Sequence, residues 1–269
     1  MLRNVFWKSL RDRRRAFLWW TAGMFGYILL SASVYPFVEE QGEQLAPLLE
    51  NMPKEMLALF GVDNPNAIFT AAGYLNSRTF GWVVPVVFSL YAAALGARAL
   101  GGEEESGTMD LLLANPVTRR RLAGEKFIAV SVVVLGLSAV LLASLLIWSA
   151  IFGLGIAADF FAAACLGAAL LGLVFGSLAL ALNGWGMSRG GAMGVVSGVA
   201  VGSFLLSSLG SLADWLEVRR RLSPFFYYSA SKPLLAGFDA ANLAVLAVTA
   251  VALAAIGVWG FSRRDVGVG

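Results

Sequence analysis

The sequence predicts an all-α polytopic membrane protein with six transmembrane helices. Of its 269 residues, 58% are hydrophobic and only 14% are charged, whereas soluble proteins carry about 25% charged residues. The mean hydropathy is +0.75, and the apolar residues gather into runs that reach the roughly 20 residues needed to cross a bilayer. No stretch outside these runs is long enough to bury a core of its own, so we expect a single transmembrane domain over residues 1–269.

Six apolar runs meet the length requirement for a membrane span. The second run contains Pro85, which membrane helices tolerate, and Asp159 and Arg189 divide the long apolar region after Lys126 into three runs. The predicted spans are 17–38, 79–100, 127–151, 160–182, 191–211 and 241–261. We expect external loops over 39–78 and 212–240 and a charged cytoplasmic segment over 101–126.

Basic residues set the predicted orientation, because cytoplasmic loops are enriched in lysine and arginine. Residues 1–16 carry a cluster of arginines with Lys8, and the segment 101–126 is also rich in arginine. Placing both on the inside leads, through six spans, to a cytoplasmic C-terminus near Arg263 and Arg264. We therefore expect both termini in the cytoplasm, although the basic cluster at 219–221 then falls on the outside.

The first 16 residues form an amphipathic pattern. Leu2, Val5, Phe6 and Leu10 recur at helical spacing among basic side chains, which is typical of a helix lying on the inner membrane surface. A second interpretation is that the cluster serves only as an orientation signal. The two interpretations are compatible.

The sequence lacks the residue combinations that most intramembrane chemistry needs. There is no histidine and a single cysteine, Cys165, and the spans hold no acidic, lysine or histidine side chain at mid-depth for catalysis, metal binding or proton coupling. None of the four lysines follows a glycine, so the chain has no phosphate-binding loop. We expect no catalytic residue, metal site or cofactor in this chain.

The segment Glu103–Leu122, EEESGTMDLLLANPVTRRRL, is the most charged interior part of the chain. Three glutamates are predicted at a helix N-terminus, Ser106 or Thr108 can cap a short helix, and Thr118 can cap the helix that enters the third span. The short helix would present Met109, Leu112 and Leu113 on one side and end at Asn115-Pro116. This pattern indicates either an exposed apolar face that docks a protein or leucines in the lipid interface with solvated charges around them.

Residues 103–126, EEESGTMDLLLANPVTRRRLAGEK, closely resemble the signature of membrane subunits of type-2 ABC exporters. That signature has paired acids before Gly-Thr, a leucine run, x-Pro-Val-Ser/Thr-Arg and a Gly-x-Lys entry to the next span. The matching positions are Glu104, Glu105, Gly107, Thr108, Leu112, Leu113, Pro116, Arg119 and Lys126. More loosely, 48–61 and 73–80 resemble the family's first external loop, and 222–237 resembles its last external segment.

The resemblance implies a half-transporter that exports a hydrophobic drug, antibiotic or lipid-like compound across a prokaryotic plasma membrane. It implies pairing with a second six-span permease subunit, as a homodimer or a related heterodimer, and with two copies of a cytoplasmic ABC ATPase that carries ATP and magnesium. No nucleic-acid partner is implied. The segment 101–126 would hold the coupling helix that docks on the ATPase, and residues 1–16 the connecting helix. The residues implied in docking are Glu103, Glu104, Glu105, Gly107, Thr108, Leu112, Leu113, Pro116 and Arg119.

Two further patterns mark candidate sites. Gly190, Gly194, Gly198 and Gly202 recur every four residues in the fifth span, a spacing that lets another helix approach closely. This ridge either packs within the subunit or contacts a second subunit or the transport path. Gly172 and Gly176 form a weaker pair in the fourth span.

The other pattern is aromatic and lies before the last span. Its residues are Pro224, Phe225, Tyr227 and Tyr228. Aromatic side chains at a membrane edge are typical of an interfacial belt, whereas the family resemblance implies a re-entrant external segment that closes the exit.

Two other functions fit the same composition. One is a secondary transporter or channel, in which backbone carbonyls rather than ionisable side chains bind the coupling ion. The other is a membrane scaffold whose segment 103–122 merely docks a cytoplasmic partner.

Overall fold

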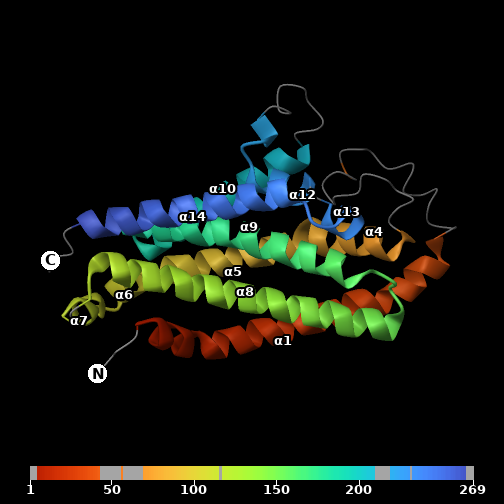
Figure 1. The fold of residues 1–269 in the computed structure, drawn as a ribbon, viewed down its shortest axis with the longest axis horizontal. Coiled ribbons are helices and arrows are strands. Elements are labelled where there is room, and N and C mark those ends of the chain that lie inside the picture. The colour runs from red at the N-terminus through yellow and green to blue at the C-terminus, as the bar shows by residue number, and fades with distance from the viewer. Residues whose placement is uncertain are drawn as a thin grey trace.

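A computed structural model describes residues 5–42, 56, 69–114, 117–209, 219–230 and 232–264. Within these ranges the secondary structure is helical, and six helices are long and apolar enough to cross a membrane. These helices lie roughly side by side in one elongated bundle (Figure 1). The all-α fold with six candidate spans is therefore confirmed.

The first span belongs to a single long helix, α1 (Val5–Glu40). It continues without a break from the basic N-terminal residues into the predicted span 17–38, so these residues and the span form one helix in the structure. α1 packs mainly against α8 (Arg119–Phe152). Near its start, Arg13 Nη2 donates to the Leu95 carbonyl at 3.2 Å and joins α1 to α5 (Val84–Ala99).

The second span is built from three helical pieces. The short α4 (Ala71–Leu75) leads into a π-helix, η2 (Asn76–Val83), and then into α5. Pro85 has no amide hydrogen and stands in the first turn of α5, so the ordinary helical bond cannot form there. At the junction the Val84 amide donates to the Thr79 carbonyl, five residues back. Such π segments are frequent at functional sites.

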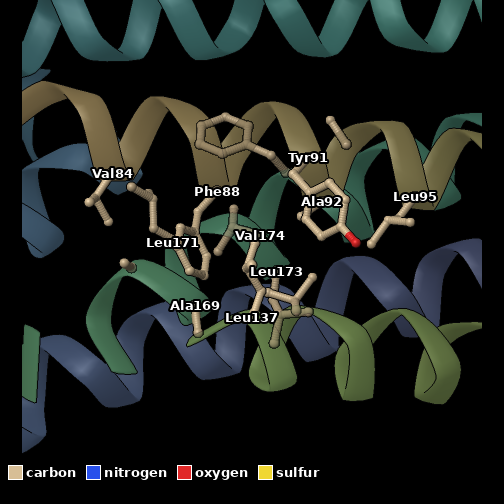
Figure 2. Close-up of a cluster of buried hydrophobic side chains, with 14 of the residues drawn as sticks. Val84, Phe88, Tyr91, Ala92, Leu95, Leu137, Ala169, Leu171, Leu173 and Val174 are labelled. Carbon is tan, nitrogen blue, oxygen red and sulfur yellow. The ribbon is translucent and has the colours of Figure 1, made fainter. Parts of the chain in front are cut away.

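The core lies between α5, α8 and α9 (Ala158–Gly184). Figure 2 shows Phe88 and Ala92 of α5 facing Leu171 and Val174 of α9, with Leu137 of α8 completing the cluster. α9 is the central helix of the bundle, since it also contacts α14 (Ala240–Arg263) along its length.

Glycines allow the helices around α9 to come close. A methyl group on Gly172 would lie 2.8 Å from the Phe88 carbonyl oxygen, and one on Gly176 would lie 2.9 Å from that of Ala92. A methyl group on Gly257 of α14 would lie 2.8 Å from the Ala181 Cα. Small residues thus bring the backbones into contact, as expected where van der Waals packing holds membrane helices together.

The two ends of the bundle carry different short helices. At one end, α6 (Gly101–Glu105) and α7 (Met109–Leu113) lie near the start of α1 and the end of α14 (Figure 1). Toward the other end, α12 (Pro224–Ala230) contacts α9, α10 (Arg189–Leu209) and α14, and α13 (Pro233–Ala236) contacts α9 and α4. Most of the predicted loop 39–78, including almost all of 48–61, lies outside the described residues, as do 212–218.

Candidate functional site

The charged segment between the second and third spans folds into two short helices with a tight turn between them. Three of the five residues of α6 are glutamates, Glu103, Glu104 and Glu105, which we call the glutamate cluster. Gly107 has a φ of +65°, a left-handed conformation that glycine adopts without a Cβ penalty. This turn directs the chain from α6 into α7.

Glu103 is the most enclosed member of the cluster and lies among basic residues of two helices. Its carboxylate forms an ion pair with Lys126 of α8, whose side chain is only 4% exposed, and approaches Lys8 of α1 at 3.8 Å. Thr108 also donates a hydrogen bond to this carboxylate. Burial alone would raise the pKa of Glu103, but the hydrogen bonds from Lys126 and Thr108 and the nearby positive charges outweigh it. The pKa is lowered from its ordinary value of 4.5, so the carboxylate is ionised at neutral pH.

Glu104 and Glu105 pair with the ends of two other helices. Arg264, just after α14, donates from Nη1 to the two carboxylate oxygens of Glu104 at 3.0 and 3.3 Å. Arg189 at the start of α10 lies 3.6 Å from Glu105. Three consecutive glutamates therefore connect α6 to α1, α8, α10 and the end of α14.

Arg264 and Arg119 extend this network. Arg119, at the start of α8, donates from Nη1 to the Arg264 carbonyl. Arg264 also donates to the Asn183 carbonyl of α9 at 3.4 Å. The charged end of the bundle is thus crosslinked by polar contacts among helices that are distant in sequence.

Two of the glutamates lie at a helix N-terminus, as predicted, because Glu103 and Glu104 are in the first turn of α6. This helix is separate from the one that carries Met109. The carboxylates of the glutamate cluster face cations of the same chain, and these cations are at least 23 residues away in sequence. The sequence contained one signal for this arrangement, because Lys126, Arg189 and Arg264 all fall at predicted span ends on the same side as the glutamates.

The short helix α7 rests on the bundle by its apolar side. Met109 and Leu112 are each 3% exposed and belong to the hydrophobic core. Of the two interpretations of this segment, the exposed apolar face is therefore wrong for these two residues, because the turn at Gly107 folds α7 back onto the bundle. Asp110 and Ala114 are exposed instead. The side chain of Leu113 and all of Asn115 and Pro116 lie outside the described residues.

The threonines at the two helix starts behave differently. Thr118 caps α8 as predicted, and its hydroxyl accepts a hydrogen bond from the Arg121 amide at 3.3 Å. Thr108 occupies the N-cap position of α7 without forming a side-chain cap. Its hydroxyl turns back to α6, where it contacts Glu103 and Ser106.

The glycine ridge of α10 faces away from the rest of the described chain. A methyl group on Gly190, Gly194, Gly198 or Gly202 would meet nothing within 4 Å. Neighbouring apolar side chains, including Val195 and Val199, are also exposed. Among the described residues, this ridge does not pack against another helix of the same subunit, so the first of the two interpretations is wrong. Gly172 and Gly176 form close contacts within the subunit instead.

The aromatic segment before the last span enters the bundle. Phe225 and Tyr228 of α12 are each 4% exposed, and the Phe225 ring packs against Phe175 of α9 and Phe204 of α10 at centroid distances of 5.6 and 5.5 Å. Tyr228 donates from its hydroxyl to the Phe80 carbonyl of η2 at 2.9 Å.

The other two residues of this predicted site are less enclosed. Pro224 and Tyr227 are half-buried. The interfacial-belt interpretation is wrong for Phe225 and Tyr228, because α12 folds back between α9 and α10 and both side chains are buried.

The six candidate spans define a multi-pass helical membrane protein. At its charged end, ion pairs connect α6 to the spans. Toward the other end, α12 folds back against α9 and α10. The profile of the family described as "ABC-2 family transporter protein" matches residues 3–266. The chain belongs to this family and is a transmembrane component of an ABC transporter. Membership implies a membrane location and partnership with an ABC ATPase. A comparison with curated proteins found no relative of significant similarity.

Proposed function

We propose that this chain is the permease subunit of an ATP-driven exporter in a prokaryotic plasma membrane. In this proposal a separate ABC ATPase binds ATP and magnesium, and the chain moves a hydrophobic drug, antibiotic or lipid-like compound out of the cell. The observation that carries the proposal is the glutamate cluster, which connects the α6–α7 turn to four other helices. A shift imposed on this turn would be passed directly to the membrane spans.

The docking surface in this proposal is the outward side of α7. Met109 and Leu112 hold the helix on the bundle, while Asp110 remains exposed. A helix anchored by its apolar side can transmit a push on its polar side without sliding. Together with the adjacent arginines of 119–121, Asp110 offers charges of both signs to a partner, which favours specific orientation at an interface.

Motion would then pass from α7 to the spans through ion pairs. When the ATPase subunits close, α7 moves with α6, and the glutamate cluster pulls on Lys126, Arg189 and Arg264. Packed helices respond to such a shift by small rigid-body sliding or tilting. In this route the ion pairs of the glutamate cluster transmit the motion from α7 to the spans.

ATP hydrolysis is assigned to the partner because the sequence lacks the required loop. Each of the four lysines follows Trp7, Pro53, Glu125 or Ser231, and a phosphate-binding loop needs Gly-Lys. Two ATPase copies and a second permease copy, identical or related, complete the proposed assembly. The unpartnered glycine ridge of α10 supports a contact between permease subunits.

The decisive experiment reconstitutes the chain with an ABC ATPase from the same organism in liposomes. We expect ATP-dependent movement of a hydrophobic compound and ATPase activity that depends on the intact complex. Asp110→Arg should lower both by about tenfold through loss of docking, an effect of the size seen for charge reversal at interfaces. Asp159→Arg is the matched control, since Asp159 is also exposed but lies in the first turn of α9, away from α7.

The two other functions predict different outcomes of this experiment. A secondary transporter or channel would move the compound down an ion gradient in liposomes that contain the chain alone. A scaffold would bind the ATPase without any movement of compound. Either result, or equal loss in Asp110→Arg and Asp159→Arg, would contradict the exporter proposal.

A further inference from the structure

A cavity lies beside α12, toward the end of the bundle opposite the glutamate cluster. We call it the α12 cavity. It has a volume of about 270 Å³ and is walled by η2, α10, α12 and the start of α13. Most sites for drug-sized ligands measure about 300–1,000 Å³, so this cavity can enclose a head group and the first part of an apolar chain.

The lining of the α12 cavity combines positive charge with hydroxyl groups. Arg220 and Lys232 line it, together with Ser207 and Ser229, and none of the lining residues within the described ranges is acidic. The two serine hydroxyls come from different helices and lie 3.5 Å apart. Guanidinium, ammonium and hydroxyl groups are the donors that recognise phosphate and carboxylate oxygens.

Arg220 carries a hydrogen-bond donor that the described residues leave unused. Its Nε is buried and has no hydrogen-bond partner among them, while its guanidinium lies 4.8 Å from the ring centroid of Phe226. The stacked ring fixes the plane of the guanidinium, as cation–π contacts do. A buried donor without an acceptor is costly, and an anionic oxygen in the cavity would satisfy it.

Aromatic rings supply the apolar part of the wall. Phe204 and Phe225 line the cavity and pack edge to face against each other at 5.5 Å. Phe225 is almost fully buried, so the apolar wall is fixed by the core of the bundle. The lining of the cavity therefore combines donors for an anion with an apolar surface.

From these observations we propose that the α12 cavity binds an amphipathic anion, with a phosphate or carboxylate group held by Arg220 and Lys232 and an apolar chain against Phe204 and Phe225. The inference goes beyond the proposed function, because binding requires neither the ATPase nor transport. A membrane phospholipid and a transported compound with the same chemistry would both fit this site.

Binding to the purified chain in a neutral detergent tests the proposal. The probes are short-chain phosphatidylglycerol, phosphatidylcholine with the same acyl chains, and glycerol phosphate without chains, each measured by calorimetry and native mass spectrometry. Because the site needs both a negative charge for its donors and an apolar chain for its aromatic wall, we expect phosphatidylglycerol to bind at least about tenfold more tightly than either of the other two.

Variants assign the binding to the cavity. Arg220→Gln should weaken phosphatidylglycerol binding by about tenfold, and Arg220→Lys should recover only part of it, because the charge remains but the Nε donor and the stacked guanidinium plane are lost. Arg221→Gln removes the same charge from the next residue, which is exposed and does not line the cavity, and should change binding by less than about twofold. If Arg220→Gln does not fold, Lys232→Gln gives the same test at the second basic residue of the lining.

Three results would overturn the proposal. Equal binding of phosphatidylglycerol and phosphatidylcholine would remove the role of the negative charge. Equal binding of glycerol phosphate and phosphatidylglycerol would remove the role of the apolar wall. Equal loss in Arg220→Gln and Arg221→Gln would place the anion outside the cavity. A failure of ATP-driven transport with intact lipid binding would count only against the exporter function.

Discussion

At the scale of single residues, the charged end of the bundle depends on the pairing of Glu103 with Lys126. Lys126 is almost completely buried, and an ammonium group in that position is stable only with a partner. Lys8 adds a second positive charge at 3.8 Å. The same carboxylate therefore compensates charges from α1 and α8, which gives it more influence on stability than its two neighbours in the sequence.

Replacing Glu103 with glutamine should destabilise the protein by about 3 kcal/mol, since Lys126 would remain buried without a counter-charge. Unfolding in mixed detergent micelles at pH 7 measures this loss. Glu105→Gln is the matched control: its pair with Arg189 is longer and half exposed, so the change should stay within about 1 kcal/mol. Similar losses in both variants would contradict the special role of Glu103.

The pH dependence of the same variant supplies a second check. The pKa of Glu103 is lowered in the folded state, so its stabilising effect is present above its ordinary value of 4.5 and disappears as the pH falls through the lowered pKa. The difference between the wild type and Glu103→Gln should therefore shrink below pH 4.5. A difference that stays constant from neutral to strongly acidic pH would mean that the ion pair is not its source.

At the scale of elements, the contact between α5 and α9 sets the position of the second span. The α9 glycines at 172 and 176 let the two backbones approach closely, because a side chain at either position would meet a carbonyl oxygen of α5. This contact also fixes η2, which continues directly into α5 and forms one wall of the α12 cavity. Helix spacing in the core thus controls the shape of a site some distance away.

Gly176→Ala should destabilise the protein by about 1–3 kcal/mol, because the added methyl group overpacks the contact with Ala92. Unfolding midpoints in detergent provide the measurement. Gly26→Ala on α1 is the control. Nothing lies within 4 Å of the added methyl group, and alanine favours a helix over glycine by roughly 1 kcal/mol, so this change should not lower the unfolding midpoint. An unchanged midpoint for Gly176→Ala would show that α5 and α9 are less closely packed.

At the scale of the whole molecule, α10 is the least enclosed of the spans. Its glycine ridge and its exposed valines form an apolar face without a partner in the described chain. Other helices also expose apolar side chains to the membrane, but α10 combines this exposure with a regular small-residue ridge. Such a ridge suits the close approach of a second helix, and a two-fold arrangement would bring the same face of two copies together.

Cysteine crosslinking tests this arrangement in native membranes. In a Cys165→Ser background, Gly198→Cys should form disulfide-linked dimers, because equivalent residues meet near a two-fold axis. Val248→Cys on α14 is equally accessible to the membrane, with an exposed fraction of 68%, and should remain monomeric. Dimers through Val248 but not through Gly198 would place the subunit contact on a different face.

The sequence alone determined the number of spans, the helical fold class and the cap at Thr118. These properties depend on the local sum of hydropathy and on short-range hydrogen bonds, both of which can be evaluated along the chain. The family signature at 103–126 likewise lies in one continuous stretch. Only the tertiary structure decided that the three glutamates pair with distant cations, and that Met109 and Leu112 are buried.

The same distinction holds for the two sets of glycines. Spacing of four residues occurs in both α9 and α10, and sequence reasoning ranked the longer ridge of α10 first. The structure assigns the close contacts within the chain to Gly172 and Gly176 and leaves the α10 ridge open. The physical reason is that a spacing defines a helix face, whereas the partner of that face depends on which helices become neighbours when the bundle assembles.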